Sequence, residues 1–134
     1  MAGIEVKART AFVTGSSRGI GRGIALKLAA CGVAQIAVHY LRNRDAAEET
    51  ARLLRERGAK PVLIQADVTQ PADISRMFAE LRSALGSLDV FVANARPDVQ
   101  HFYRPVFDLA LEQWRAAIDS QATALLLCAR EAVA

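Results

Sequence analysis

The feature that most constrains how this chain can fold is the stretch VTGSSRGIG at residues 13–21. It follows the apolar run TAFV, which predicts a buried strand, and it leads into apolar residues spaced four apart, which predict a helix. A glycine turn between strand and helix is the setting in which such a motif binds phosphate, because the free N–H groups and the dipole of the helix N-terminus attract an anion. The alternative is a glycine-rich turn that carries no ligand.

Each glycine of this stretch has an expected role. Gly15 lets the chain leave the strand in a sharp turn that a Cβ would obstruct. Gly19 lets the backbone approach a pyrophosphate, and Gly21 lets the helix pack closely against the strand. A P-loop is excluded, because no Lys-Ser or Lys-Thr pair follows the glycines.

Length and composition indicate one soluble globular domain, since the chain has 134 residues of which 52% are hydrophobic. A run of about 18 apolar residues is absent, so we expect no membrane span. The first nine residues contain no apolar signal segment, which favours a cytoplasmic protein. Cys31 and Cys128 stand alone without a Cys-x-x-Cys pair, so we expect reduced cysteines on helices and no metal site.

The net charge of +3 raises nucleic acid as an alternative partner. However, the arginines are spread over several segments, and no cluster of aromatic and basic residues accompanies them. Arg18, Arg22, Arg42 and Arg44 fall where the predicted fold would gather them around one phosphate. We therefore expect no nucleic-acid partner.

Strand and helix patterns alternate along the whole chain. Helices are predicted over residues 19–31, 45–57, 71–85 and from about 110 onward, and strands over residues 9–14, 35–40, 61–65 and 89–93. This alternation predicts an α/β fold, a three-layer doubly wound parallel sheet of the Rossmann type with right-handed crossovers. The expected strand order is 3-2-1-4, which opens a ligand crevice between the first and fourth strands.

The end of the second strand favours NADP(H) over NAD(H). A site for NAD usually has an acid about 20 residues past the glycines, but residues 39–44 read HYLRNR and contain none. Arg42, Arg44 and Arg18 would instead bind a 2′-phosphate through bidentate hydrogen bonds. The alternative is a solvated arginine pair that opens a helix. The candidate contacts from this strand end and the glycine loop are Ser17, Arg18, Ile20, Tyr40, Arg42, Asn43 and Arg44.

The motif TGxxxGIG at residues 14–21 resembles the cofactor motif of the short-chain dehydrogenase/reductase family. Asp67 and Val68, after the third strand, resemble the family's acid beside the adenine ring and its apolar neighbour. Asn94 and Ala95 resemble the start of the family's Asn-Ala-Gly, whose asparagine steadies the central sheet and the cofactor side of the crevice.

Two positions depart from the family pattern. In the family, the glycine of Asn-Ala-Gly gives the backbone room near the cofactor. Arg96 replaces this glycine, so the arginine is expected to crowd or reshape the site. Gln121 stands at the position of a family asparagine in the helix after the fourth strand. It is the one catalytic candidate in the chain, because its amide can still bond a water.

The family's catalytic serine and Tyr-x-x-x-Lys pair have no counterpart in this sequence. Tyr40 is followed four residues later by Arg44 and Tyr103 by Phe107, and no lysine occurs after Lys60. The resemblance therefore implies an NADP(H)-binding domain over residues 1–134 that forms the N-terminal half of a longer single domain.

By resemblance, the whole protein would be an oxidoreductase that reduces a carbonyl or enoyl group. Its substrate would be a small molecule or an acyl-carrier-protein-linked group, since the chain looks closest to enoyl reductases and ketoreductases of fatty-acid and polyketide type. The alternatives are a non-catalytic NADP(H)-binding or sensor protein and an oligomerisation module.

The last predicted helix carries more large apolar side chains than one contact with the sheet would cover. A helix of this kind favours self-association, and in the family fold it packs against its copy in a second subunit. We therefore expect a homo-oligomer through the last helix. The apolar side chains are Trp114, Ile118, Leu125, Leu126 and Leu127.

Overall fold

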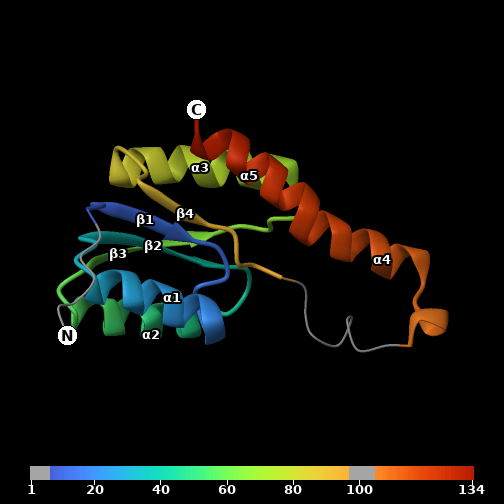
Figure 1. Cartoon of the computed structure of the whole chain (residues 1–134), viewed down its shortest axis with the longest axis horizontal. Coiled ribbons are helices and arrows are strands. Elements are labelled where there is room, and N and C mark those ends of the chain that lie inside the picture. The colour runs from blue at the N-terminus through green and yellow to red at the C-terminus, as the bar shows by residue number, and fades with distance from the viewer. Residues whose placement is uncertain (1–6, 97–104) are drawn as a thin grey trace.

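The computed structural model describes residues 7–96 and 105–134. Within these ranges a parallel sheet contains the strands β1 (Thr10–Val13), β2 (Gln35–Tyr40), β3 (Lys60–Gln65) and β4 (Val90–Val92). Their order is β3-β2-β1-β4 (Figure 1), which confirms the predicted topology. The order reverses between β1 and β4, so a ligand crevice belongs at the carboxyl ends of these two strands.

Helices cover both faces of the sheet, as the α/β pattern predicts. One face is covered by α1 (Gly19–Ala30) and α2 (Arg44–Arg55), and the other by α3 (Pro71–Leu85) and α5 (Ala124–Ala132) (Figure 1). Helix α4 (Leu111–Ile118) extends beyond the sheet on the side where α5 begins (Figure 1). The result is the predicted three-layer arrangement.

Alternate side chains of each strand enter the two halves of the core. Val13 and Val38 pack on the side of α1 and α2, whereas Phe12 packs on the side of α3. The ring of Phe12 lies 5.8 Å from the rings of both Phe78 on α3 and Phe91 on β4. Burial on both faces explains why β1 and β2 are mostly apolar in the sequence.

Local signals mark the start of α2 and both ends of α3. The Asn43 side chain accepts a hydrogen bond of 2.9 Å from the Ala46 N–H and caps α2. Pro71 occupies the first turn of α3, and Gly86 ends that helix with φ of +77°. For α1, α2 and α3 the predicted boundaries agree with the structure to within two residues.

The segment predicted as one last helix is divided. After the short 3₁₀ helix η2 (Val106–Asp108), α4 is followed by a π-helical turn, η3 (Asp119–Thr123), and then by α5. The wider turn shifts the helix faces relative to a continuous α-helix, and it leaves Ser120, Ala124 and Cys128 buried. The spacing of apolar residues does not reveal this insertion, because a single wide turn interrupts an otherwise helical pattern.

The apolar residues of this segment do not share one environment. Trp114 and Leu126 remain 55% and 52% exposed, as the expectation of an uncovered apolar surface requires. Leu127 differs from that expectation, because it packs against the core between the sheet and α3. The uncovered surface therefore excludes Leu127.

Cys31 and Cys128 are both free and buried; Cys128 lies on α5 as predicted, whereas Cys31 directly follows the last residue of α1. None of the helices in the described part of the chain has the length and apolarity that crossing a bilayer requires.

Candidate cofactor site

The glycine turn after β1 is built by close backbone contacts. Gly15 has φ of +66°, and a Cβ there would lie 3.0 Å from the Cα of Ala95. A Cβ on Gly21 would lie 2.3 Å from the Gly15 carbonyl oxygen and 2.6 Å from the Asn94 side-chain nitrogen. The start of α1 is therefore pressed against the turn and the end of β4, as the motif predicts.

Gly19 has a different environment from the other two motif glycines. Its φ is +57°, but a Cβ there would meet nothing within 4 Å. This side of the loop is open, and Ile20 beside it is 74% exposed. An open backbone at the N-terminus of α1 is the cradle that a pyrophosphate requires.

Asn94 and Thr14 join the carboxyl ends of β4 and β1. The Thr14 hydroxyl oxygen accepts hydrogen bonds of 2.9 Å from the N–H groups of both Asn94 and Ala95. The Asn94 amide in turn donates to the Thr14 carbonyl oxygen at 2.9 Å. These bonds give the asparagine the sheet-steadying position that the resemblance implies. The role of Thr14 was not predicted, although its place before the glycines is a usable signal.

His39 is a buried residue of the site that the sequence reasoning missed. Its Nδ1 accepts a 2.8 Å hydrogen bond from the Gly15 N–H, and its Nε2 lies 3.0 Å from the Ala66 carbonyl oxygen. The backbone N–H of His39 donates to the Ser16 hydroxyl at 3.0 Å. Burial lowers the pKa of the imidazole, while the bond to Ala66 and the charge of Asp67 oppose this shift. A polar residue near the end of an apolar strand was the available signal.

Arg22 does not join the arginines expected around a phosphate. Its guanidinium donates to the Thr50 hydroxyl at 2.8 Å, to the Ser17 carbonyl at 2.7 Å and to the Ala46 carbonyl at 3.1 Å. Thr50 also donates to the Ser17 carbonyl at 2.9 Å. Arg22 thus ties α1 to α2 and fixes the backbone of the loop, because its helical register turns it toward α2.

The other arginines of the predicted phosphate site are exposed. Arg18 precedes α1, and Arg42 follows β2, so both lie at the carboxyl side of the sheet. Arg44 is within 3.5 Å of Glu48, and both side chains are largely exposed. Tyr40 is buried beneath this region, and the Asn43 oxygen is occupied by helix capping.

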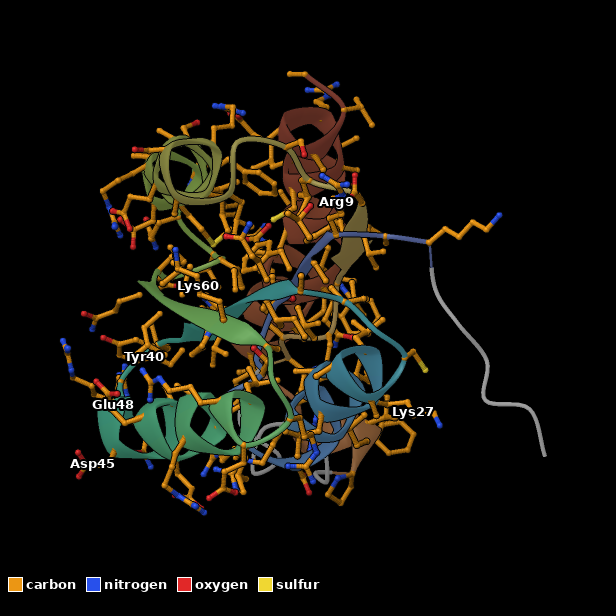
Figure 2. The ribbon with its side chains drawn as sticks, turned by 90° about the vertical axis from the view of Figure 1, so that its left-hand side faces the viewer. Arg9, Lys27, Tyr40, Asp45, Glu48 and Lys60 are labelled. Atoms are coloured by element: carbon orange, nitrogen blue, oxygen red, sulfur yellow. The ribbon has the colours of Figure 1, made fainter. Side chains whose placement is uncertain are left out.

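The labelled charges show how the basic residues are distributed. Tyr40, Asp45 and Glu48 lie on one side of the molecule, whereas Arg9 and Lys27 lie on the opposite side (Figure 2). Lys60 lies on the side of Tyr40 and Glu48 (Figure 2), so the labelled basic residues do not gather on one surface.

The residues after β3 form a tight turn. The Asp67 carboxylate accepts hydrogen bonds from the backbone N–H and the hydroxyl of Thr69, at 2.9 and 2.7 Å. The Asp67 N–H donates to Asp73 at 2.8 Å. One Asp67 oxygen is thus committed to the turn, while Val68 faces the neighbouring cleft.

A cleft of about 410 Å³ lies between the ends of β1 and β4 and the η3–α5 segment. It brings Asn94, Ala95 and Val68 to the same space as Gln121, which the sequence places far away. Arg96 and Gln121 are exposed at this cleft, and Cys128 is a buried part of its wall. Burial raises the pKa of the Cys128 thiol to about 11, so it remains a neutral group.

Tyr103 and His101 lie outside the described residues. Within the described ranges, no group of three or more His, Cys, Asp or Glu side chains has an arrangement that would hold a metal ion.

Comparison with known proteins identifies relatives along almost the entire chain. A family model described as Enoyl-(Acyl carrier protein) reductase matches residues 15–134. A short-chain type dehydrogenase/reductase of Picea abies is 35% identical over 130 residues, covering 92% of this chain and 47% of the relative. The 3-oxoacyl-acyl-carrier-protein reductase FabG of Staphylococcus epidermidis is 34% identical over 120 residues, covering 90% and 48%.

A solved structure indicates the same family as the sequence relatives. A short-chain dehydrogenase/reductase of Serratia marcescens superimposes with a TM-score of 0.85 and 29% identity, covering 98% of this chain and 51% of that one. The chain thus spans about half the length of the relatives it matches. The extent of these matches, together with the glycine turn and the Thr14–Asn94 link, shows that the chain belongs to the short-chain dehydrogenase/reductase family.

Proposed function

We propose that the chain binds NADP(H) and is the cofactor-binding part of an oxidoreductase that reduces a carbonyl or enoyl group. The observation that carries this proposal is the open glycine loop, with Arg18 and Arg42 exposed at the same edge of the sheet and no acid in residues 39–44. An acid would repel a 2′-phosphate, whereas guanidinium groups match its geometry. The exposed ion pair between Arg44 and Glu48 contributes little stability, so Arg44 could leave Glu48 and contact the phosphate instead.

The residues of the site would divide the work of holding the dinucleotide. The N–H groups at the start of α1 would bind the pyrophosphate, and Val68 would pack beside the adenine ring. Thr14 and Asn94 would hold the loop against β4 without contacting the reacting atoms. When bound, the cofactor would supply a hydride.

Reduction of a carbonyl or enoyl group also requires a proton. Gln121 lines the cleft and is exposed, so its amide could orient a water or a substrate oxygen. An amide does not itself supply a proton at neutral pH. The proton donor of the proposed reaction would therefore come from residues outside the site described above.

The proposed substrate class rests on the relatives. FabG is a 3-oxoacyl-acyl-carrier-protein reductase, and the matching family model carries an enoyl-reductase description. These names favour a carbonyl or enoyl group, with an acyl-carrier-protein-linked substrate as the specific proposal.

A second candidate is an NADP(H)-binding or sensor protein without catalysis. Two observations favour it: Arg96 and Gln121 both line the cleft where the family pattern has glycine and asparagine. Turnover of ketone or enoyl substrates by the full protein would exclude this candidate, whereas NADP(H) binding without turnover would support it.

The cofactor assignment is tested by the double variant Arg42→Ala/Arg44→Ala. Calorimetric titration should show a loss of roughly 1–3 kcal/mol in the binding free energy of NADPH, because charge-assisted hydrogen bonds are removed. The affinity for NADH should change little. The control Arg55→Ala/Arg57→Ala removes the same charge from exposed positions at the far end of α2. Equal losses for both cofactors, or an equal loss in the control, would contradict the assignment.

A further inference from the structure

We propose that His39 is a positioning residue that fixes the glycine loop in its binding conformation, and that protonation of its ring releases the loop and lowers dinucleotide affinity. The proposal rests on the proposed function, because the loop is taken to be the dinucleotide site. It extends that function in two ways. His39 holds the loop without contacting the dinucleotide, and protonation of its ring opposes dinucleotide binding.

The hydrogen bonds of His39 determine its protonation state. The Gly15 N–H can only donate, so Nδ1 of His39, 2.8 Å away, must be unprotonated. Nε2 then carries the proton and donates to the Ala66 carbonyl oxygen at 3.0 Å. A doubly protonated ring would direct an N–H group at the Gly15 N–H, and the bond between the ring and the loop would be lost.

The loop has little freedom to adapt to a protonated ring. Gly15 is held at φ of +66° and is enclosed by Ala95 and by the start of α1 at Gly21. The neighbouring residue is tied to the same strand, because the Ser16 hydroxyl accepts the His39 backbone N–H at 3.0 Å. Loss of the ring contact therefore displaces the turn that leads into the open backbone at Gly19.

The surroundings of the imidazole favour the neutral form. His39 is 3% exposed, and its ring meets that of Phe12 edge-on at 6.3 Å. Neither β1 nor β4 contributes an ionisable side chain, and Tyr40 on β2 belongs to the opposite half of the core. Burial lowers the pKa of His39 below its ordinary value, so the ring is neutral at pH 7.

Charged groups near the ring come mainly from the segment after β3. Asp67 is the charge that favours the imidazolium. Asp73 and Arg76 at the start of α3 pair with each other at 3.2 Å, and Lys60 lies at the distant beginning of β3. Cys128, on the same side of the sheet, stays neutral because burial raises its pKa to about 11. His39 is thus the group in these surroundings whose charge changes as the pH falls through its lowered pKa.

Two amide variants separate the bonds made by the ring. His39→Asn places an acceptor near the position of Nδ1 and retains the bond from Gly15. His39→Gln reaches toward Ala66 and loses the bond from Gly15. Neither side chain titrates between about pH 5 and pH 8. A purely structural role predicts similar losses in both variants, whereas the proposal predicts that Asn rescues binding and Gln does not.

Affinities for NADP⁺ and NAD⁺ are measured by calorimetry across this pH range, with circular dichroism confirming the fold at each point. In the wild type, affinity should fall by up to about tenfold per pH unit below the pKa of His39, the slope of one linked proton. The slope should appear with both cofactors, which excludes titration of the 2′-phosphate as its cause. His39→Asn should bind without this slope, and His39→Gln should bind at least about tenfold more weakly at pH 8, the loss of one bond in the loop.

A measurement made without cofactor tests the inference independently of the proposed function. The hydrogen-exchange protection factor of the Gly15 amide should fall on acidification in the wild type and stay constant in His39→Asn. A constant protection factor in the wild type, an unchanged pH slope in His39→Asn, or equal binding by the Asn and Gln variants would overturn the inference. Failure of the wild type to bind either dinucleotide at pH 8 would instead overturn the proposed function.

Discussion

Replacing Gly21 by alanine should destabilise the protein, although alanine is the better helix former. The added Cβ would lie 2.3 Å from the Gly15 carbonyl oxygen and 2.6 Å from the Asn94 amide nitrogen. The carbonyl is backbone, so no side-chain rotation can relieve the contact. The start of α1 would have to move by about 1 Å to restore ordinary packing distances, and interiors resist such shifts.

The size of the effect follows from two opposing contributions. Overpacking a well-packed site costs typically about 1–3 kcal/mol, and here the obstacle is the backbone, which places the cost at or above the upper end. Replacement of a helical glycine by alanine returns about 1 kcal/mol. We therefore expect a net loss of roughly 2 kcal/mol in the free energy of unfolding, accompanied by weaker dinucleotide binding.

Gly23 supplies a matched control in the same helix. A Cβ there would meet nothing within 4 Å, so Gly23→Ala should stabilise the protein by up to about 1 kcal/mol. Urea denaturation followed by circular dichroism measures both variants. If Gly21→Ala were as stable as Gly23→Ala, the close packing of α1 on the glycine turn would not exist in solution, and the reasoning would be refuted.

Three further predictions concern assembly, acid stability and activity. Leu126 is 52% exposed on α5, and we expect the protein to self-associate through this surface. Leu126→Glu should therefore weaken the association measured by analytical ultracentrifugation. A 14.5 kDa monomer at all concentrations would contradict this prediction. The backbone N–H groups of Arg9 and Thr10 lower the pKa of the Asp89 carboxyl, so stability should be lost as the pH falls through that lowered pKa. Denaturation curves should show that Asp89→Asn is less stable than the wild type at pH 7, and that this difference in unfolding free energy shrinks below about pH 4. Protein of these 134 residues should not reduce ketones or enoyl groups with NADPH above background in a spectrophotometric assay; clear turnover would indicate that Tyr103 or another residue of this chain supplies the proton.

Local patterns in the sequence determined the architecture of this protein. The apolar runs and helical spacings predicted each strand and the order β3-β2-β1-β4. Gly15 and Gly21 were predictable because a turn and a close helix contact exclude side chains, whatever the rest of the chain does. These signals are readable because each depends on neighbours within a few residues or on the general geometry of parallel sheets.

The tertiary structure decided how individual polar side chains are used. Arg22 was expected near a phosphate, but its place on α1 directs it to Thr50 on α2. Asn43 was expected to contact a cofactor, and the structure shows its oxygen capping α2. Sequence spacing cannot distinguish such roles, because the competing partners come from segments that meet only when the helices pack against the sheet.

The site shows the same division between local and long-range information. Asn94 was identified by its resemblance to the family's Asn-Ala-Gly after the fourth strand, but its bonds to Thr14 join positions that are 80 residues apart. His39 was missed because its strand predicts only burial, and its function as an acceptor for Gly15 arises when β2 aligns beside β1. The sequence by itself determined which segments form the sheet and the glycine turn. Only the packing of distant segments decided which polar groups hold that turn, because hydrogen bonds depend on distances that the chain order does not contain.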